Sequence, residues 1–137
     1  MILALTSFGF GVCAFAACLC HDYLGCGLLI ALTSTSILHH ANGCDKRKYI
    51  GGSIVSPVDH TLAHIIAVRS VYATFSYGVI GAPVYMSTLY VVLVYYHRLW
   101  SASTYHRGHK LIPWHASIHI VSQLGCLYGY GLKFVTT

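Results

Sequence analysis

Apolar residues form five long runs that short polar segments interrupt. The runs cover approximately residues 2–20, 23–42, 54–78, 83–100 and 111–131. Each has about the 20 residues that a helix needs to cross a hydrocarbon core roughly 30 Å thick. The interruptions at 21–22, 42–48, 81–83 and 100–110 are rich in glycine, proline and polar residues, which break helices. The pattern predicts an all-α membrane protein, a single domain over 1–137 with a bundle of about five transmembrane helices.

The first run has an alternative interpretation as a secretory signal peptide. It lacks the basic residues that begin such a peptide, and its apolar stretch is long. We therefore expect it to be a retained helix of the bundle.

The composition strengthens the membrane interpretation. Only 8% of the 137 residues are charged and 56% are hydrophobic, whereas a soluble domain carries about 25% charged residues. This excludes an ordinary soluble enzyme, a disordered chain and, despite the net charge of +5, a nucleic-acid binder. We expect an integral, multi-pass protein whose partners are the lipid bilayer and a membrane lipid.

The basic residues predict how the bundle is oriented. With five helices, the N-terminus and the loops between helices two and three and helices four and five share one side. Lys133 is the basic residue of the other side, and the first side has Lys46, Arg47, Lys48, Arg98, Arg107 and Lys110. Lysine and arginine gather in cytoplasmic loops. We therefore expect a cytoplasmic N-terminus.

Polar side chains at three helix ends suggest a metal site. Ser36 and His40 are four residues apart near the end of the second helix, as are His115 and His119 near the start of the fifth. Asp59 lies early in the third. Residues four apart share a helix face, and two imidazoles so placed can ligate one metal ion. The alternating helix directions put all three groups at one membrane depth.

These positions resemble the CREST superfamily, which includes the alkaline ceramidases and the progestin/adipoQ receptors. The resemblance implies an intramembrane hydrolase with zinc as its cofactor, held by His40, His115 and His119. It also implies that Asp59 holds and deprotonates the zinc-bound water, and that Ser36 assists the water or the oxyanion. The family has seven helices, and this chain has room for five.

The chemistry is also coherent without the resemblance. Three neutral imidazoles and a water form an open, catalytic type of zinc site. A site just inside the bilayer can meet an amide or ester bond at the headgroup boundary. The leading hypothesis is a zinc-dependent lipid hydrolase, either a ceramidase-like amidase or an esterase.

Other functions stay open at this point. Facing histidines also ligate haem in helical bundles, which would give a haem- or metal-binding redox protein. A non-catalytic scaffold or channel with a structural metal site is a further alternative, and so is a metal-ion or proton transporter. A homo-oligomer that completes the five-helix bundle is also open.

Several side chains have more than one interpretation. Ser36 could bond back to a carbonyl of its own helix, and Asp59 could cap a helix that begins after Pro57. His39, His60 and His64 stay open as replacement ligands or as groups that orient the ligands. Arg69 lies deep in the third helix, where a charge is costly, and no carboxylate is an evident partner.

Overall fold

The computed structural model describes residues 2–41, 52–77, 81–101 and 108–136, and that part of the chain is helical apart from short turns. The all-α prediction is confirmed. The helices are α1 (Ile2–Ser7), α2 (Gly9–Leu19), α3 (Tyr23–Ala41), α4 (Gly52–Tyr77), α5 (Gly81–Ser101) and α6 (Gly108–Thr136). α6 is longer than predicted at both ends, because hydropathy marks only the apolar part of a helix.

The first predicted helix is divided in two at Phe8. The Thr6 carbonyl, near the end of α1, accepts a hydrogen bond of 2.6 Å from Nε2 of Gln123 on α6. A Cβ at Gly9, the first residue of α2, would clash with the side chain of the same glutamine. The break therefore occurs where α6 approaches the backbone of this segment closely.

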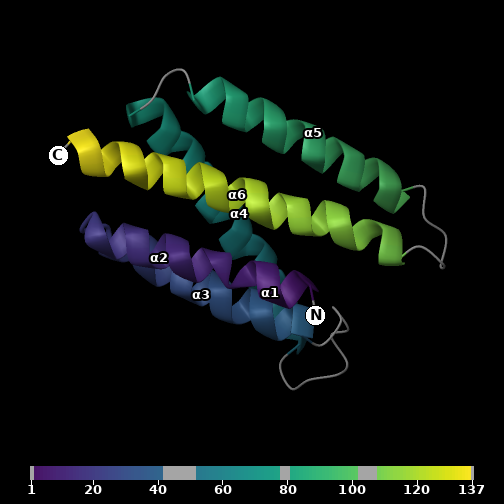
Figure 1. Cartoon of the computed structure of the whole chain (residues 1–137). Helices are drawn as coiled ribbons and strands as arrows, with labels where there is room; N and C mark the ends of the chain where they lie inside the picture. The colour runs from purple at the N-terminus through teal and green to yellow at the C-terminus, as the bar shows by residue number, and fades with distance from the viewer. Residues whose placement is uncertain (1, 42–51, 78–80, 102–107, 137) are drawn as a thin grey trace.

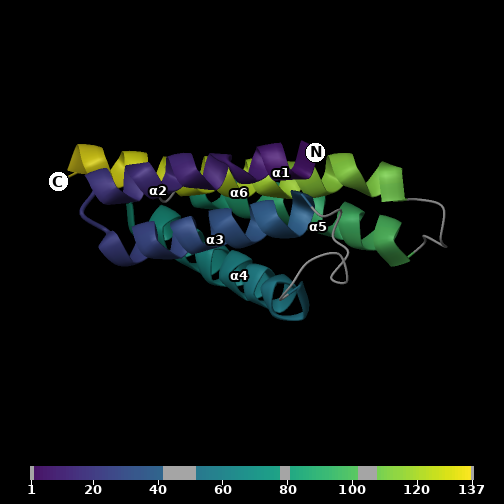
Figure 2. The ribbon, with the colours of Figure 1, turned by 90° about the horizontal axis from the view of Figure 1, so that it is seen from below.

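The helices form a bundle that one member crosses at an angle. α1 and α2 lie along α3, and α6 packs against α1, α2, α4 and α5. α4 crosses the others obliquely, as Figures 1 and 2 show. The core lies between α2, α3, α4 and α6 and contains Phe10, Cys13, Ala14, Ala17, Leu29, Leu32, Ile66 and Cys126.

The turn between α2 and α3 is held by its own backbone and one carboxylate. The N–H groups of His21 and Asp22 bond to the carbonyls of Cys18 and Ala17, at 3.0 and 2.9 Å. This pairing is a Schellman motif, with His21 in the left-handed region at φ 54°. The Asp22 carboxylate then accepts the Gly25 N–H at 2.9 Å, which caps the start of α3.

Asp22 is also the partner of Arg69, so the expectation that Arg69 has no evident carboxylate was wrong. Arg69 Nη2 lies 2.6 Å from Asp22 Oδ2, and the Tyr130 hydroxyl donates to the same oxygen at 2.8 Å. One carboxylate thus joins the α2–α3 turn to α4 and α6. Asp22 and Arg69 are 47 positions apart in the sequence, so no local sequence pattern reveals this pairing.

We expect Arg69→Leu to destabilise the bundle in a pH-dependent way. Burial by itself raises the pKa of the Asp22 carboxyl, but the hydrogen bonds from Gly25, Tyr130 and Arg69 outweigh it, so this pKa lies below the usual 3.8. The stabilisation is therefore present at neutral pH and is lost as the pH falls below the pKa of the folded state. Because 38% of the Arg69 side chain is exposed, we expect a loss of only about 1 kcal/mol at pH 7.

Thermal denaturation in detergent, followed by circular dichroism at pH 7 and at low pH, measures this effect. Tyr72→Leu, at an exposed position of the same helix, is the matched control and should show no such pH dependence. A destabilisation by Arg69→Leu that is equally large at both pH values would contradict the assignment.

Two stretches of the described residues are long and apolar enough to cross a membrane, Ile2–Leu19 and Tyr23–Ala41. In α5 the apolar stretch Tyr85–Tyr95 is shorter, while α4 and α6 carry several histidines and cations that lower their hydropathy. The structure therefore shows the five predicted helices, counting α1 and α2 as one, and two candidate spans among them.

The cytoplasmic orientation of the N-terminus stays a prediction. Four of the basic residues on which it depends lie outside the described residues, namely Lys46, Arg47, Lys48 and Arg107.

Candidate metal centre

Three histidines from two helices converge at one end of the bundle. His40 is in the last turn of α3, and His115 and His119 are in the first half of α6. Each offers a ring nitrogen, and these three atoms lie within 4.8 Å of one another. The ring centroids are 4.8 to 5.1 Å apart. The predicted convergence is confirmed, and we call these residues the histidine triad.

Helix direction explains why the triad forms. The start of α1, the end of α3 and the first part of α6 lie at the same end of the bundle (Figure 1). His115 and His119 are one helical turn apart on one face, so both reach the end of α3 together. His40 and His119 are buried and His115 is half-buried.

Thr6 on α1 holds the ring of His119, a contact that the sequence analysis missed. Its hydroxyl oxygen lies 3.0 Å from Nδ1 of His119 and also donates to the carbonyl of Leu3 at 3.0 Å. Because the carbonyl can only accept, the single hydroxyl proton is used there, and Nδ1–H of His119 donates to Thr6. The Nε2 lone pair of His119 is then available to a metal, as in most protein metal sites.

The sequence contained a feature that could have identified Thr6 as a neighbour of the histidines. Thr6 and Ser7 are adjacent polar residues in an otherwise apolar run. The five-helix topology already placed the start of that run on the same side as the histidines.

Ser36 does not bond back to its own helix in the structure. Its neighbours Thr33, Ser34 and Thr35 do so, each donating to the carbonyl four residues earlier at 2.7 to 3.0 Å. Ser36 is buried and instead pairs with the hydroxyl of Ser7 at 2.9 Å. It therefore joins α3 to α1 one turn before His40, on the same face of α3.

Asp59 lies inside α4 and is not a helix cap, because α4 begins at Gly52. The side chain is buried, and its Oδ1 lies 3.3 Å from Thr35 Oγ1, whose single proton is shared with the carbonyl of Ala31. It also interacts with Ser36 and with the nearby rings of His39 and His60. The carboxylate therefore sits between α3 and α4 at the level of Ser36 and is not one of the three converging ligands.

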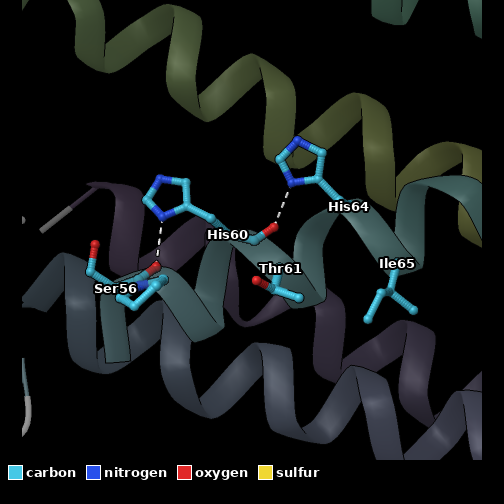
Figure 3. A pocket seen from close by; sticks show the side chains of 6 residues that line it. Ser56, His60, Thr61, His64 and Ile65 are labelled. Carbon is cyan, nitrogen blue, oxygen red and sulfur yellow. Dashed lines mark hydrogen bonds between the residues drawn. The ribbon is translucent and has the colours of Figure 1, made fainter. Parts of the chain in front are cut away.

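Three further histidines, His39, His60 and His64, extend from the triad toward the surface. His39 is buried, with its ring centroid 5.2 Å from that of His40 and 6.0 Å from that of His60. His60 and His64 are exposed on α4, where both rings lie on the same side of the helix (Figure 3). Among the described residues, the triad is the one group of three or more ligand side chains close enough to share an ion.

The triad can hold a metal ion with a coordination position left open. In a tetrahedral site with metal–nitrogen bonds of about 2.0–2.1 Å, ligand nitrogens are about 3.3 Å apart. Small side-chain rotations close the difference from 4.8 Å. Three protein ligands leave the fourth position for water or substrate, which is the arrangement of a catalytic site. The donor set fits zinc and several other divalent ions.

Comparisons with known proteins give no further guidance to the function of this centre. No family model, curated protein or solved structure matches the chain.

Proposed function

We propose that this chain is an integral membrane hydrolase of the CREST type that uses zinc to cleave an amide or ester bond of a lipid. The observation that carries the proposal is the convergence of His40, His115 and His119 within 4.8 Å at a buried helix end. Three imidazole nitrogens this close together can bind one metal ion, and three histidines are the protein ligands of one common type of catalytic zinc site.

The apolar side chains on the surface of the bundle are consistent with helices that lie in lipid. Large apolar side chains face outward on α2, α4, α5 and α6, where Phe15, Val68, Tyr90 and Leu124 expose 65%, 70%, 69% and 61% of their surface. An apolar surface of this extent indicates contact with a membrane or partner. The proposal places the helices across the bilayer with the N-terminus on the cytoplasmic side.

Zinc in such a site acts as a Lewis acid and lowers the pKa of its water to about 7. The protein residues then have separate tasks. Thr6 holds the ring of His119 by Nδ1 and leaves Nε2 as the nitrogen that would bind the ion, and Ser36 supplies a polar group one turn from His40.

Asp59 is the proposed general base and acid. It accepts the proton of the attacking water and returns it to the leaving nitrogen or oxygen when the carbon–nitrogen or carbon–oxygen bond breaks. Thr35 fixes one oxygen of the carboxylate. The products are a free fatty acid and the corresponding amine or alcohol, so atoms and protons balance with water as the co-substrate.

The test is hydrolysis by the purified full-length chain in mixed micelles. Lipids carrying a single acyl amide or acyl ester are supplied, and released fatty acid is measured by mass spectrometry. We expect release that a chelator abolishes and added zinc restores. A Soret band in the purified protein, or bound metal without turnover of any acyl amide or ester, would contradict the proposal.

A further inference from the structure

We propose that a pocket between α4 and α6 binds an anionic phospholipid whose phosphate is held by Arg69 and Lys133. This inference rests on the placement of the helices across the bilayer, and not on metal binding or hydrolysis. The pocket lies at the opposite end of the bundle from the triad, so the bound lipid takes no part in the proposed reaction there.

The pocket lies beside the turn between α2 and α3. Asp22 of this turn forms part of its wall, as do Arg69 of α4 and Lys133 of α6. Figure 1 shows the turn and the end of α6 at one end of the bundle, and the start of α1 toward the other. The turn joins the two candidate membrane spans, so the proposed orientation places it at the level of the lipid headgroups. Long charged side chains at this level reach phosphate groups and water instead of acyl chains.

The charges in the pocket favour an anion. Among the described residues that line it, two are cations and one is a carboxylate. Arg69 Nη2 lies 2.6 Å from Asp22 Oδ2, and 38% of the Arg69 side chain stays exposed. Because it contacts the turn, this guanidinium lies at the headgroup level although its backbone is within α4. Lys133 is in the last turn of α6 and is half-buried. The cation in excess of the carboxylate attracts a negative ligand.

The two cations can make complementary contacts with a phosphate. A guanidinium has five N–H donors in a planar fork that matches two phosphate oxygens, and the contact with Asp22 Oδ2 uses one of them. Tyr130 donates to the same carboxylate oxygen at 2.8 Å, so Asp22 is itself held and fixes Arg69 at the pocket. The Lys133 ammonium, one turn after Tyr130, adds a second positive group on this face of α6.

The rest of the wall suits the apolar part of a lipid. Leu29, Ile66 and Cys126 line the pocket and are buried. Val68, also in the wall, is exposed on the apolar outside of α4. The volume of about 450 Å³ falls in the range of about 300 to 1,000 Å³ that is typical of small-molecule sites, and free phosphate would fill little of it. Cations beside an apolar wall therefore favour a phospholipid over inorganic phosphate.

Native mass spectrometry of the detergent-purified full-length protein, titrated with phosphatidylglycerol, tests the site. We expect one lipid per chain to bind more tightly than any further lipid. Phosphatidylcholine and diacylglycerol with the same acyl chains lack the net charge and the phosphate, respectively, and should bind about tenfold more weakly. Equal affinity for all three lipids would overturn the proposal. So would inorganic phosphate that displaces the lipid at equal concentration, because the ligand would then be the free ion.

Substitutions separate this site from a general attraction of anionic lipid to a basic protein. Lys133→Gln and Arg69→Gln should each weaken the binding of phosphatidylglycerol about tenfold. Lys133 lies in the last turn of α6, so its replacement leaves the core intact, which circular dichroism checks. Lys110→Gln removes a cation from the first turn of the same helix and is the matched control, with the wild-type affinity expected. Wild-type affinity in Lys133→Gln, or an equal loss in Lys110→Gln, would overturn the site.

Failure of the proposed hydrolase has a different signature. His115→Ala/His119→Ala lacks two of the metal ligands and should still bind phosphatidylglycerol with the wild-type affinity. A chain that stays soluble without detergent would refute the membrane placement itself. A chain that needs detergent and shows no preference for phosphatidylglycerol would refute this lipid site alone.

Discussion

His115→Ala/His119→Ala should abolish tight metal binding and leave the helices intact. Two of the three converging ligands disappear in this variant, and one imidazole alone does not hold zinc in competition with water. Elemental analysis of the detergent-purified protein should fall from about one zinc per chain to almost none. Circular dichroism should show the same helix content, because the core side chains between α2, α3, α4 and α6 are unchanged.

Thermal stability gives an independent readout of the same change. Metal that binds only the folded state adds about 4 kcal/mol to the free energy of unfolding when the free ion is a thousandfold above its Kd. A chelator should therefore lower the melting temperature of the wild type and leave that of the variant unchanged. His21→Ala, on the α2–α3 turn, should respond like the wild type. A double variant that keeps tightly bound zinc would contradict the site.

Asp59→Asn should abolish turnover and preserve the metal. The amide has nearly the shape of the carboxylate and still accepts a hydrogen bond from Thr35, but it cannot take up a proton at neutral pH. Loss of a general base typically slows a reaction by about 100- to 10,000-fold, and we expect a decrease in kcat of this size. Zinc content should equal that of the wild type, since Asp59 is not one of the three converging ligands.

Asp22→Asn is the matched control for this substitution. It removes the carboxylate of the α2–α3 turn, weakens the contact with Arg69 and keeps an acceptor for the cap of α3. Activity per folded molecule should stay close to the wild-type value. If Asp59→Asn retained full activity, or lost its zinc, Asp59 would not be the base of the reaction.

Much of the site could be predicted from the order of the residues along the chain. Each helix reverses the direction of the one before it, so His40 at the end of one helix and His115 and His119 near the start of another fall at the same depth. Whether two helix ends lie on the same side depends only on the number of helices between them. The same reasoning would have drawn attention to Thr6 and Ser7, which lie in the first turns of the first run.

The interpretations of single side chains were less accurate. Asp59 was open to interpretation as a cap because Pro57 precedes it, but α4 begins at Gly52 and carries the proline inside the helix. Ser36 was open to interpretation as a back-bonded serine, as its neighbours are, but it faces Ser7 across the α1–α3 contact. The full length of α4 excludes the cap at Asp59. The contact with α1 replaces the back-bond of Ser36.

Hydrophobic runs and the alternation of helix direction determined the all-α class, the five helical regions and the end of the bundle at which the polar groups lie, because these depend only on residue order. The rotation of each helix about its axis was decided by tertiary packing. α3 and α6 are only weakly amphipathic, so no sequence pattern assigns the face that turns inward. The observed rotations bring Gln123 of α6 against Gly9 and Ser36 of α3 against Ser7. The same rotations bring the three imidazoles together.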